Sequence, residues 1–293
     1  MGATAGCAQK TAAVAEVTSS LPAMSSHTSP AIELRGTSKA FRTPSGALHT
    51  AVRDLDLTVG HGEFVAVVGP TGCGKSTTLT LVSGLEEPTE GEVLVAGEPV
   101  RGIASNVGFV FQQDAVFPWR SVLSNVMAGP RFRGVPKQEA KERAREWLAR
   151  VGLSSFEDRY PHQLSGGQRK RVALASTFVN DPEILLMDEP FSALDVQTRA
   201  LMSDELLELW AGTGACVVFV THDLEESIAL ADKVVVMTAG PATVKEVFEI
   251  DLPRPRKVES VRLEPRFVEI YREIWSSLGE EVRITRERGA VDA

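Results

Sequence analysis

A glycine-rich loop directly after an apolar run limits what this chain can fold into more than any other feature. The loop, residues 69–76, reads Gly-Pro-Thr-Gly-Cys-Gly-Lys-Ser and follows the uninterrupted apolar segment Phe64–Val68. A buried strand, a glycine loop and then a helix is the arrangement of a phosphate-binding loop. The backbone N–H groups of such a loop surround phosphate groups at a helix N-terminus. The sequence therefore predicts an α/β fold that binds a nucleoside triphosphate.

The loop residues divide the work of holding that nucleotide. Lys75 would bring a positive charge to the β and γ phosphates, and Ser76 would offer its hydroxyl to Mg²⁺. Modification of the Cys73 thiol inside the loop should block nucleotide binding sterically. The predicted contacts are Gly69, Pro70, Thr71, Gly72, Cys73, Gly74, Lys75, Ser76 and Thr77.

A second motif supplies two acids at the end of another apolar run. Ile184–Met187 reads as a buried strand, and Asp188 and Glu189 follow it directly. An apolar strand that ends in Asp is common in proteins, but the added Glu-Pro favours a functional interpretation. Asp188 is suited to bind Mg²⁺ and Glu189 to polarise an attacking water molecule.

The third motif is the pentapeptide Leu164–Gln168, Leu-Ser-Gly-Gly-Gln. By itself it can be a helix N-cap with a flexible approach. Together with the two preceding motifs it resembles the signature of the ATP-binding cassette (ABC) ATPases, and the resemblance covers roughly residues 32–250. The family implies a mixed or parallel sheet, an antiparallel β subdomain and an inserted helical subdomain.

The resemblance implies that ATP is shared between two subunits. In the family the signature segment contacts ATP held by the phosphate loop of the other subunit, so hydrolysis requires a head-to-tail dimer. The residues implied in this contact are Ser165, Gly166, Gly167 and Gln168. Asp195 lies in the segment that links the two subunits.

Three further positions match the family in chain order. Gln112 would contact Mg²⁺ and the reacting centre, His222 would sense the γ-phosphate, and Phe41 would stack on adenine. Each match is weak when taken singly. His222 could simply cap the helix that starts at Asp223, and a single Phe before a strand is more often a core residue.

The implied function is ATP hydrolysis that energises a membrane transporter. The segment Phe117–Arg120 has the apolar and aromatic character of an interface and lies where the family receives its membrane subunit. The chain resembles most closely the importer ATPases for nitrate, sulfonates and taurine, which act with a solute-binding protein at the cytoplasmic face of the membrane. Gln168 and Lys170 depart from their usual pattern, so the solute stays open, as does export.

Two other classes compete with this interpretation. A soluble cassette ATPase of DNA repair or translation typically has coiled-coil arms or two cassettes in one chain, and neither is seen in the sequence. A phosphate-loop kinase would share Lys75 and Asp188 but would have no use for Leu164–Gln168.

Composition excludes several partners. The formal net charge is −8, and no basic block is long enough to follow a phosphate backbone, so nucleic acid is not expected to bind. Cys7, Cys73 and Cys216 form no metal-binding pattern and fit a reducing compartment. No apolar run reaches the roughly 18 residues of a membrane span, so any membrane role requires a partner.

The expected organisation has three parts. Residues 1–30 read as a disordered leader, residues 31–250 as the cassette with helices inserted at about 115–178, and residues 251–293 as a helical tail. In the tail we expect a docking helix, with a regulatory contact as the alternative. Its apolar stripe is Phe267, Ile270, Tyr271, Ile274, Trp275 and Leu278.

Overall fold

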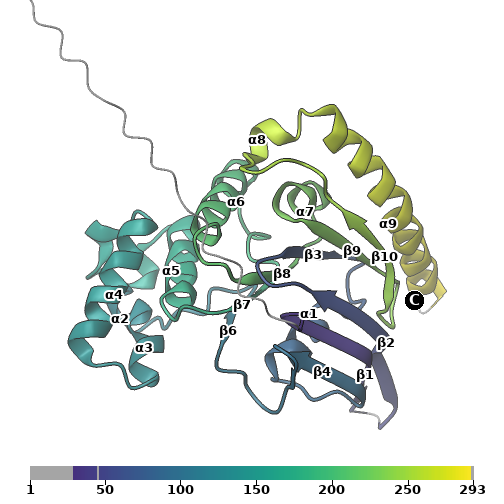
Figure 1. Ribbon diagram of the computed structural model, residues 1–293, viewed down its shortest axis with the longest axis horizontal. Helices are drawn as coiled ribbons and strands as arrows, with labels where there is room; N and C mark the ends of the chain where they lie inside the picture. The colour runs from purple at the N-terminus through teal and green to yellow at the C-terminus, as the bar shows by residue number, and fades with distance from the viewer. Residues whose placement is uncertain (1–28, 45, 292–293) are drawn as a thin grey trace, which may run out of the picture.

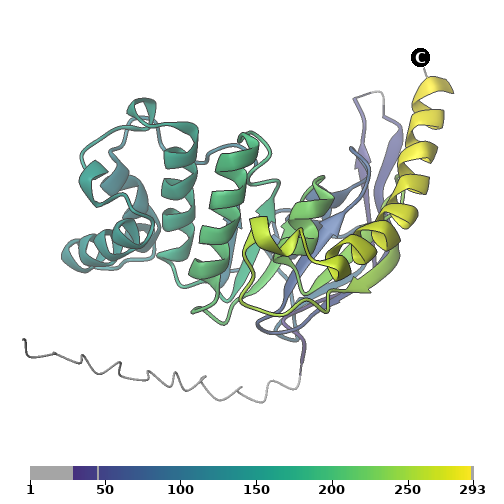
Figure 2. The ribbon, with the colours of Figure 1, turned by 90° about the horizontal axis from the view of Figure 1, so that it is seen from above.

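Two β-sheets and a separate group of helices make up the computed structural model, which describes residues 29–44 and 46–291. The predicted disordered leader, residues 1–30, lies outside the described residues except for its last two positions. Figure 1 and Figure 2 show the helical group at one end of the molecule and the C-terminal helix α9 (Pro265–Val291) at the other.

The central sheet has the strand order β10-β9-β3-β8-β7-β6. The five strands from β9 to β6 run parallel, whereas β10 pairs antiparallel with β9. The sheet is therefore mixed, which is one of the two forms, mixed or parallel, that the resemblance implies. Parallel strands end at a common edge, and loops that leave that edge therefore meet. The bounds are β3 (Phe64–Val68), β6 (Val107–Val110), β7 (Ile184–Asp188), β8 (Cys216–Val220), β9 (Lys233–Met237) and β10 (Val244–Glu249).

Alternate residues of these strands enter two different hydrophobic cores, because successive side chains of a strand point to opposite faces. Phe64 and Ala66 pack toward the helices α6 (Val196–Trp210) and α7 (Leu224–Leu230). Val65 and Val67 pack toward α1 (Lys75–Ser83) and the second sheet. Burial on both faces explains why the parallel strands are continuous apolar runs.

The second sheet is antiparallel and has the order β2-β1-β4-β5. Its long strands β1 (Ile32–Arg42) and β2 (Leu48–Val59) pair so that Phe41 lies opposite His49. The shorter strands are β4 (Glu90–Val95) and β5 (Glu98–Pro99).

The helical group follows β6 in the chain and ends with α5 (Gly166–Phe178), which leads back to β7. It contains α2 (Val122–Val126), α3 (Ala128–Phe132), α4 (Lys137–Arg150) and the short 3₁₀ helices Ser154–Phe156 and Pro161–Gln163. Helix α4 is amphipathic, and the Trp147 ring on its buried face stacks on Phe178 of α5 with the centroids 5.3 Å apart.

The tail is helical, as predicted, and consists of α8 (Val258–Val261) and α9. Phe267, Ile270, Ile274 and Leu278 are buried and dock α9 beside α7 and β9. The expectation that Trp275 belongs to the packed face is wrong, because this side chain is 51% exposed. The apolar stripe is therefore wider than the surface on which α9 packs.

Candidate functional site

An open cleft of about 600 Å³ lies where the loops after β3, β6, β7 and β8 come together. Most of its lining was predicted from the sequence. His49 and Ala51 were not, and both come from β2 of the antiparallel sheet. The lining residues are Phe41, His49, Ala51, Thr71, Gly72, Gly74, Lys75, Ser76, Thr77, Gln112, Glu189 and His222.

The phosphate loop passes close against β2 at Gly74, the N-cap of α1. Gly74 has φ 124°, and a Cβ there would lie 2.5 Å from the Ala51 carbonyl oxygen. Only glycine fits both the backbone angle and the space. The close approach lets α1 begin immediately at Lys75, with the unpaired N–H groups of its first turn at the cleft.

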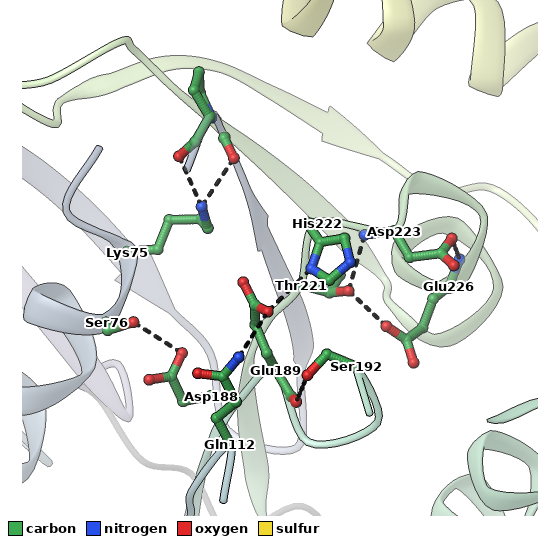
Figure 3. Close-up of polar contacts among 12 residues, drawn as sticks. Lys75, Ser76, Gln112, Asp188, Glu189, Ser192, Thr221, His222, Asp223 and Glu226 are labelled. Carbon is green, nitrogen blue, oxygen red and sulfur yellow. Dashed lines mark hydrogen bonds and ion pairs between the residues drawn. The ribbon is translucent and has the colours of Figure 1, made fainter. Parts of the chain in front are cut away.

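Lys75 is held over the phosphate loop by the loop itself. Its Nζ donates hydrogen bonds to the carbonyl oxygens of Gly69 at 2.8 Å and Pro70 at 2.9 Å, and the side chain is buried (Figure 3). Gly69 and Pro70 thus contribute to the site through their carbonyls. Cys73 is 2% exposed, and burial raises the pKa of its thiol, so this side chain faces the core rather than the cleft.

Ser76 and Asp188 bring a hydroxyl and a carboxylate together. Ser76 Oγ donates to Asp188 Oδ1 at 3.0 Å, from the first turn of α1 to the end of β7 (Figure 3). Burial raises the pKa of Asp188, and a bound cation would reverse that shift. Hydroxyl and carboxylate oxygens are the donors that Mg²⁺ prefers, so the pair fits this ion.

Glu189 follows β7 in a left-handed backbone conformation, with φ 41°. This conformation is unfavourable for a residue with a Cβ and persists only where its surroundings hold it. The Glu189 N–H donates to Val220 O at 2.9 Å, and its carbonyl accepts from Ser192 Oγ at 3.1 Å. The strained turn directs the carboxylate into the cleft.

The carboxylate of Glu189 contacts two of the other predicted residues. Its Oε2 lies 3.0 Å from His222 Nδ1 and 3.4 Å from Gln112 Nε2 (Figure 3). These bonds come from the loops after β8 and β6, so the three side chains meet only in the folded sheet. A carboxylate held in this way can accept a proton from a water molecule in the cleft.

The segment around His222 is fixed by buried polar contacts. Asp223, rather than His222, caps α7, by accepting from the Glu226 N–H at 3.1 Å. Arg199 Nη1 donates to Asp223 Oδ2 at 2.7 Å, and Thr221 Oγ1 donates to Glu226 Oε2 at 2.6 Å. Burial raises the pKa of Glu226 to about 7.

The alternative that His222 merely caps this helix is wrong, because the cap is Asp223.

The signature segment does not line the cleft of its own chain. Ser165 caps α5: its Oγ accepts from Gln168 N at 3.3 Å, and Gln168 Oε1 accepts from Ser165 N at 3.0 Å. Asp195 caps α6 in the same manner, accepting from Thr198 N at 3.0 Å. The structure thus separates five predicted residues from the cleft, namely Ser165, Gly166, Gly167, Gln168 and Asp195.

An apolar patch lies on the helical group, and part of it follows Gln112 by a few residues in the chain. Trp119 and Phe132 are 71% and 72% exposed, and the Arg120 guanidinium lies over the rings of Phe117 and Phe132. The buried Asn125 shapes the turn beneath them by accepting from Phe117 N at 2.6 Å. We call Phe117, Trp119, Arg120 and Phe132 the aromatic patch.

The fold and the cleft together define a phosphate-loop nucleoside triphosphatase. The structure joins a helix N-terminus and its lysine, a hydroxyl–carboxylate pair and a carboxylate positioned for water on one sheet edge. These are the parts that phosphoryl transfer to water requires, because the reaction depends mainly on positioning and charge.

Known proteins are similar to this chain in sequence and in fold. The sequence profile of the ABC transporter family matches residues 52–192. An uncharacterized ABC transporter ATP-binding protein of Methanocaldococcus jannaschii is 48% identical over 232 residues, which cover 79% of this chain and 85% of that protein.

Two relatives carry more specific names. The taurine import ATP-binding protein of Roseobacter denitrificans is 36% identical, covering 88% of this chain and 99% of its own length. The nitrate import ATP-binding protein of Synechococcus elongatus is 40% identical, and the alignment covers 79% of this chain and 85% of that protein. A solved cassette, dimeric and bound to ADP and Pi, has a TM-score of 0.67 and 31% identity, covering 76% of this chain and all of its own.

This chain belongs to the ABC transporter family, as an ATP-binding subunit. It is an ATPase whose activity is coupled to transport across a membrane. Among the described residues, no helix combines the length and the apolar character needed to cross a bilayer. The relatives give no support to the alternative of a repair or translation ATPase.

Proposed function

We propose that this chain energises an importer of nitrate, taurine, another sulfonate or a similar small solute. Relatives named for taurine and nitrate import align with most of the chain. These alignments carry the assignment of the solute class, and the division of the site, with the signature segment outside the cleft, carries the expectation of a second subunit. A cleft that lacks its signature needs a second subunit.

Within the cleft each side chain has a proposed role. Lys75 neutralises phosphate charge, Glu189 accepts the proton of the attacking water, and His222 orients Glu189 and contacts the γ-phosphate. Phe41 stacks on adenine, and His49 lies opposite it in the β1–β2 pairing. Removal of one such positioned group should lower the hydrolysis rate by about 10²- to 10³-fold.

We further propose Mg²⁺ as the metal of this site. Ser76, Asp188 and the amide oxygen of Gln112 would hold it, because all three offer the hard oxygen ligands that the ion prefers. When bound, the ion supplies positive charge that offsets the phosphate oxygens. The raised pKa of Asp188 fits a buried carboxylate whose negative charge is stabilised when a cation binds to it.

The working unit in this proposal is a dimer of ATPase subunits. Ser165, Gly166, Gly167, Gln168 and Asp195 of one subunit would complete the cleft of the other. The similar solved cassette is a dimer bound to ADP and Pi, which supports this arrangement. Helix α5 presents its free N-terminal N–H groups beyond Ser165, and such groups favour a phosphate.

The aromatic patch is the proposed contact with the membrane permease. It includes the predicted segment Phe117–Arg120 and lies on the same chain segment as Gln112. A movement of the permease against the aromatic patch would therefore be transmitted to the cleft through the few residues between Gln112 and Phe117. The permease in turn would act with a solute-binding protein, which places this subunit at the cytoplasmic face of the membrane as a peripheral protein.

Uptake by cells tests the function. In the organism that carries the gene, Glu189→Gln should abolish uptake of labelled taurine, nitrate or an alkanesulfonate. Glu249→Gln is the matched control, because this glutamate lies far along the chain on β10 and its side chain is 72% exposed. Unchanged uptake of all three solutes in the Glu189→Gln strain would refute the assigned solute class.

A further inference from the structure

Helix α9 holds a loop that borders the phosphate loop. The loop, Thr238–Thr243, joins β9 to β10. Glu281 Oε2 of α9 accepts from the Ala239 N–H at 2.7 Å, and Arg288 Nη1 donates to the Ala239 and Gly240 carbonyl oxygens at 2.9 and 2.7 Å. Both polar backbone atoms of Ala239 are therefore bonded by side chains of one helix. Figure 1 and Figure 2 show α9 passing along this side of the molecule.

The same loop packs tightly against the phosphate loop. A Cβ at Gly74 would lie 2.9 Å from the Ala242 Cβ, and a Cβ at Gly240 would lie 3.8 Å from the Cys73 Cα. The contact at Gly74 leaves no space for a methyl group, and the contact at Gly240 is ordinary van der Waals packing, so a shift of one loop is felt by the other. Glu281 and Arg288 thus bond to a segment that the phosphate loop itself contacts.

A second connection runs through β2. Ala242 N donates to Ala51 O at 2.8 Å, and Arg53 N donates to Ala242 O at 2.9 Å. The Ala51 oxygen is the atom closest to the position of a Cβ on Gly74. Ala242 therefore also sets the position of the strand on which Gly74 rests.

Glu281 is a buried carboxylate rather than a surface charge. The residue is 6% exposed, and Lys245 Nζ lies 2.8 Å from its Oε1. Burial of a carboxylate is costly unless it is paired and hydrogen-bonded. Docking of α9 does not require it, because the apolar residues from Phe267 to Leu278 already provide the packing.

We propose that Glu281 and Arg288 are positioning residues for ATP binding, which hold the loop Thr238–Thr243 in place beneath the phosphate loop. The inference rests on the ATPase function assigned to that phosphate loop. It gives α9 a regulatory role in addition to docking, because displacement of its C-terminal half would loosen the backbone that receives the phosphates.

The test uses the full chain and ATP itself. Glu281→Ala should weaken ATP binding, measured by calorimetry, about tenfold, the equivalent of ~1.4 kcal/mol. The KM for ATP should rise in parallel, with kcat within about twofold, since no reacting group is touched. Glu281→Gln should restore most of the affinity, because the amide oxygen can still accept from Ala239 N–H.

Two controls separate positioning from folding. Glu280→Ala changes the neighbouring glutamate, which also pairs with Lys245 but does not bond to the loop, and should bind ATP as the wild type does. Arg288→Gln should weaken binding like Glu281→Ala and serves if Glu281→Ala does not fold. Equal loss in Glu280→Ala, or wild-type affinity in both Arg288→Gln and the folded Glu281→Ala, would overturn the proposal. A wild-type chain that neither binds nor hydrolyses ATP would instead refute the assigned function.

Discussion

Glu226 lies at the base of the His222 segment and is 4% exposed. One carboxyl oxygen accepts from Thr221 Oγ1, and the other has no hydrogen-bond partner. Burial raises the pKa of this group to about 7, and the charge of Asp223 adds to the shift. The folded chain therefore keeps this proton over a pH range in which the unfolded chain has lost it.

Between the unfolded pKa near 4.5 and the folded pKa near 7 the folded state binds more protons, so its stability falls as pH rises. Across this range the free energy of unfolding should drop by on the order of 3 kcal/mol from this group. Urea unfolding at pH 5, 6, 7 and 8 measures the drop.

Glu226→Gln should remove that part of the slope and be the more stable form at pH 8. Glu225→Gln, on the same helix with a side chain 49% exposed, should keep the wild-type slope. Identical slopes in the wild type and Glu226→Gln would contradict the assignment of the raised pKa.

Among the elements, helix α5 is bonded to the segment after β6 by a charge pair whose lysine is buried. Lys170, with a side chain 4% exposed, places Nζ 2.9 Å from Asp114 Oδ1 and 3.3 Å from Gln112 O. Arg169 Nε donates to Asp114 Oδ2 at 3.2 Å. Lys170 is one of the positions where the sequence departs from the importer pattern, and here it connects the signature helix with Gln112.

Loss of one partner from this pair should be costly. Lys170→Met should lower the free energy of unfolding by about 2 kcal/mol, because Asp114 loses its buried partner and keeps only its bond from Arg169. The double variant Asp114→Asn with Lys170→Met should recover most of that loss, as measured by urea unfolding.

A matched exposed pair provides the control. Arg145 Nη2 lies 2.9 Å from Glu157 Oε2, and the two side chains are 52% and 21% exposed. Arg145→Met should lower the free energy of unfolding by no more than about 1 kcal/mol. A similar cost for Lys170→Met and Arg145→Met would show that burial does not strengthen the inner pair.

The sequence predicts elements well where the local pattern is strong. The strand Phe64–Val68 and the helix directly after the glycine loop are confirmed, because an uninterrupted apolar run and a glycine loop are local signals. Strand β6 was not predicted, since its four residues include a glycine, and β10 alternates with charges and is partly exposed. Both are strands because of their neighbours in the sheet.

The same distinction holds for the cleft: some of its residues are predictable from the local sequence, and others reach it only through contacts between distant segments. The phosphate loop and Asp188 are readable from their own sequence context. His49 and Ala51 are not, because they reach the cleft only through the pairing of β1 with β2. The contact of α9 with Ala239 joins residues 42 positions apart in the chain and has no local signal.

For the whole molecule, the aromatic patch and the cleft are the two surfaces for which we propose partners. Trp119→Ala should sharply reduce co-purification with the permease when the two are expressed together, since exposed aromatic residues are common binding anchors. Its thermal midpoint should stay near that of the wild type, because Trp119 is 71% exposed.

A comparably exposed apolar residue elsewhere serves as the control for this surface. Leu263 is 83% exposed and lies in the tail, so Leu263→Ala should co-purify normally. Retention of the permease by Trp119→Ala, or equal loss in Leu263→Ala, would exclude the aromatic patch as the contact.

Two ATP molecules that each contact both subunits can close the dimer. A shift from mostly open to mostly closed requires about 5.5 kcal/mol of differential binding, which two shared ligands divide between them. In the proposed dimer, hydrolysis would remove that stabilisation and reopen the pair, so that ATP turnover would drive a conformational cycle in the permease.

The most direct test of the shared site is the mass of the Glu189→Gln chain in solution, measured by light scattering with and without ATP and Mg²⁺. We expect a monomer without ATP and a dimer with it, while the wild type hydrolyses ATP. Adding Gly167→Arg to the variant should prevent the dimer by blocking the signature. A Glu189→Gln chain that stays monomeric with ATP and still hydrolyses it would contradict the account.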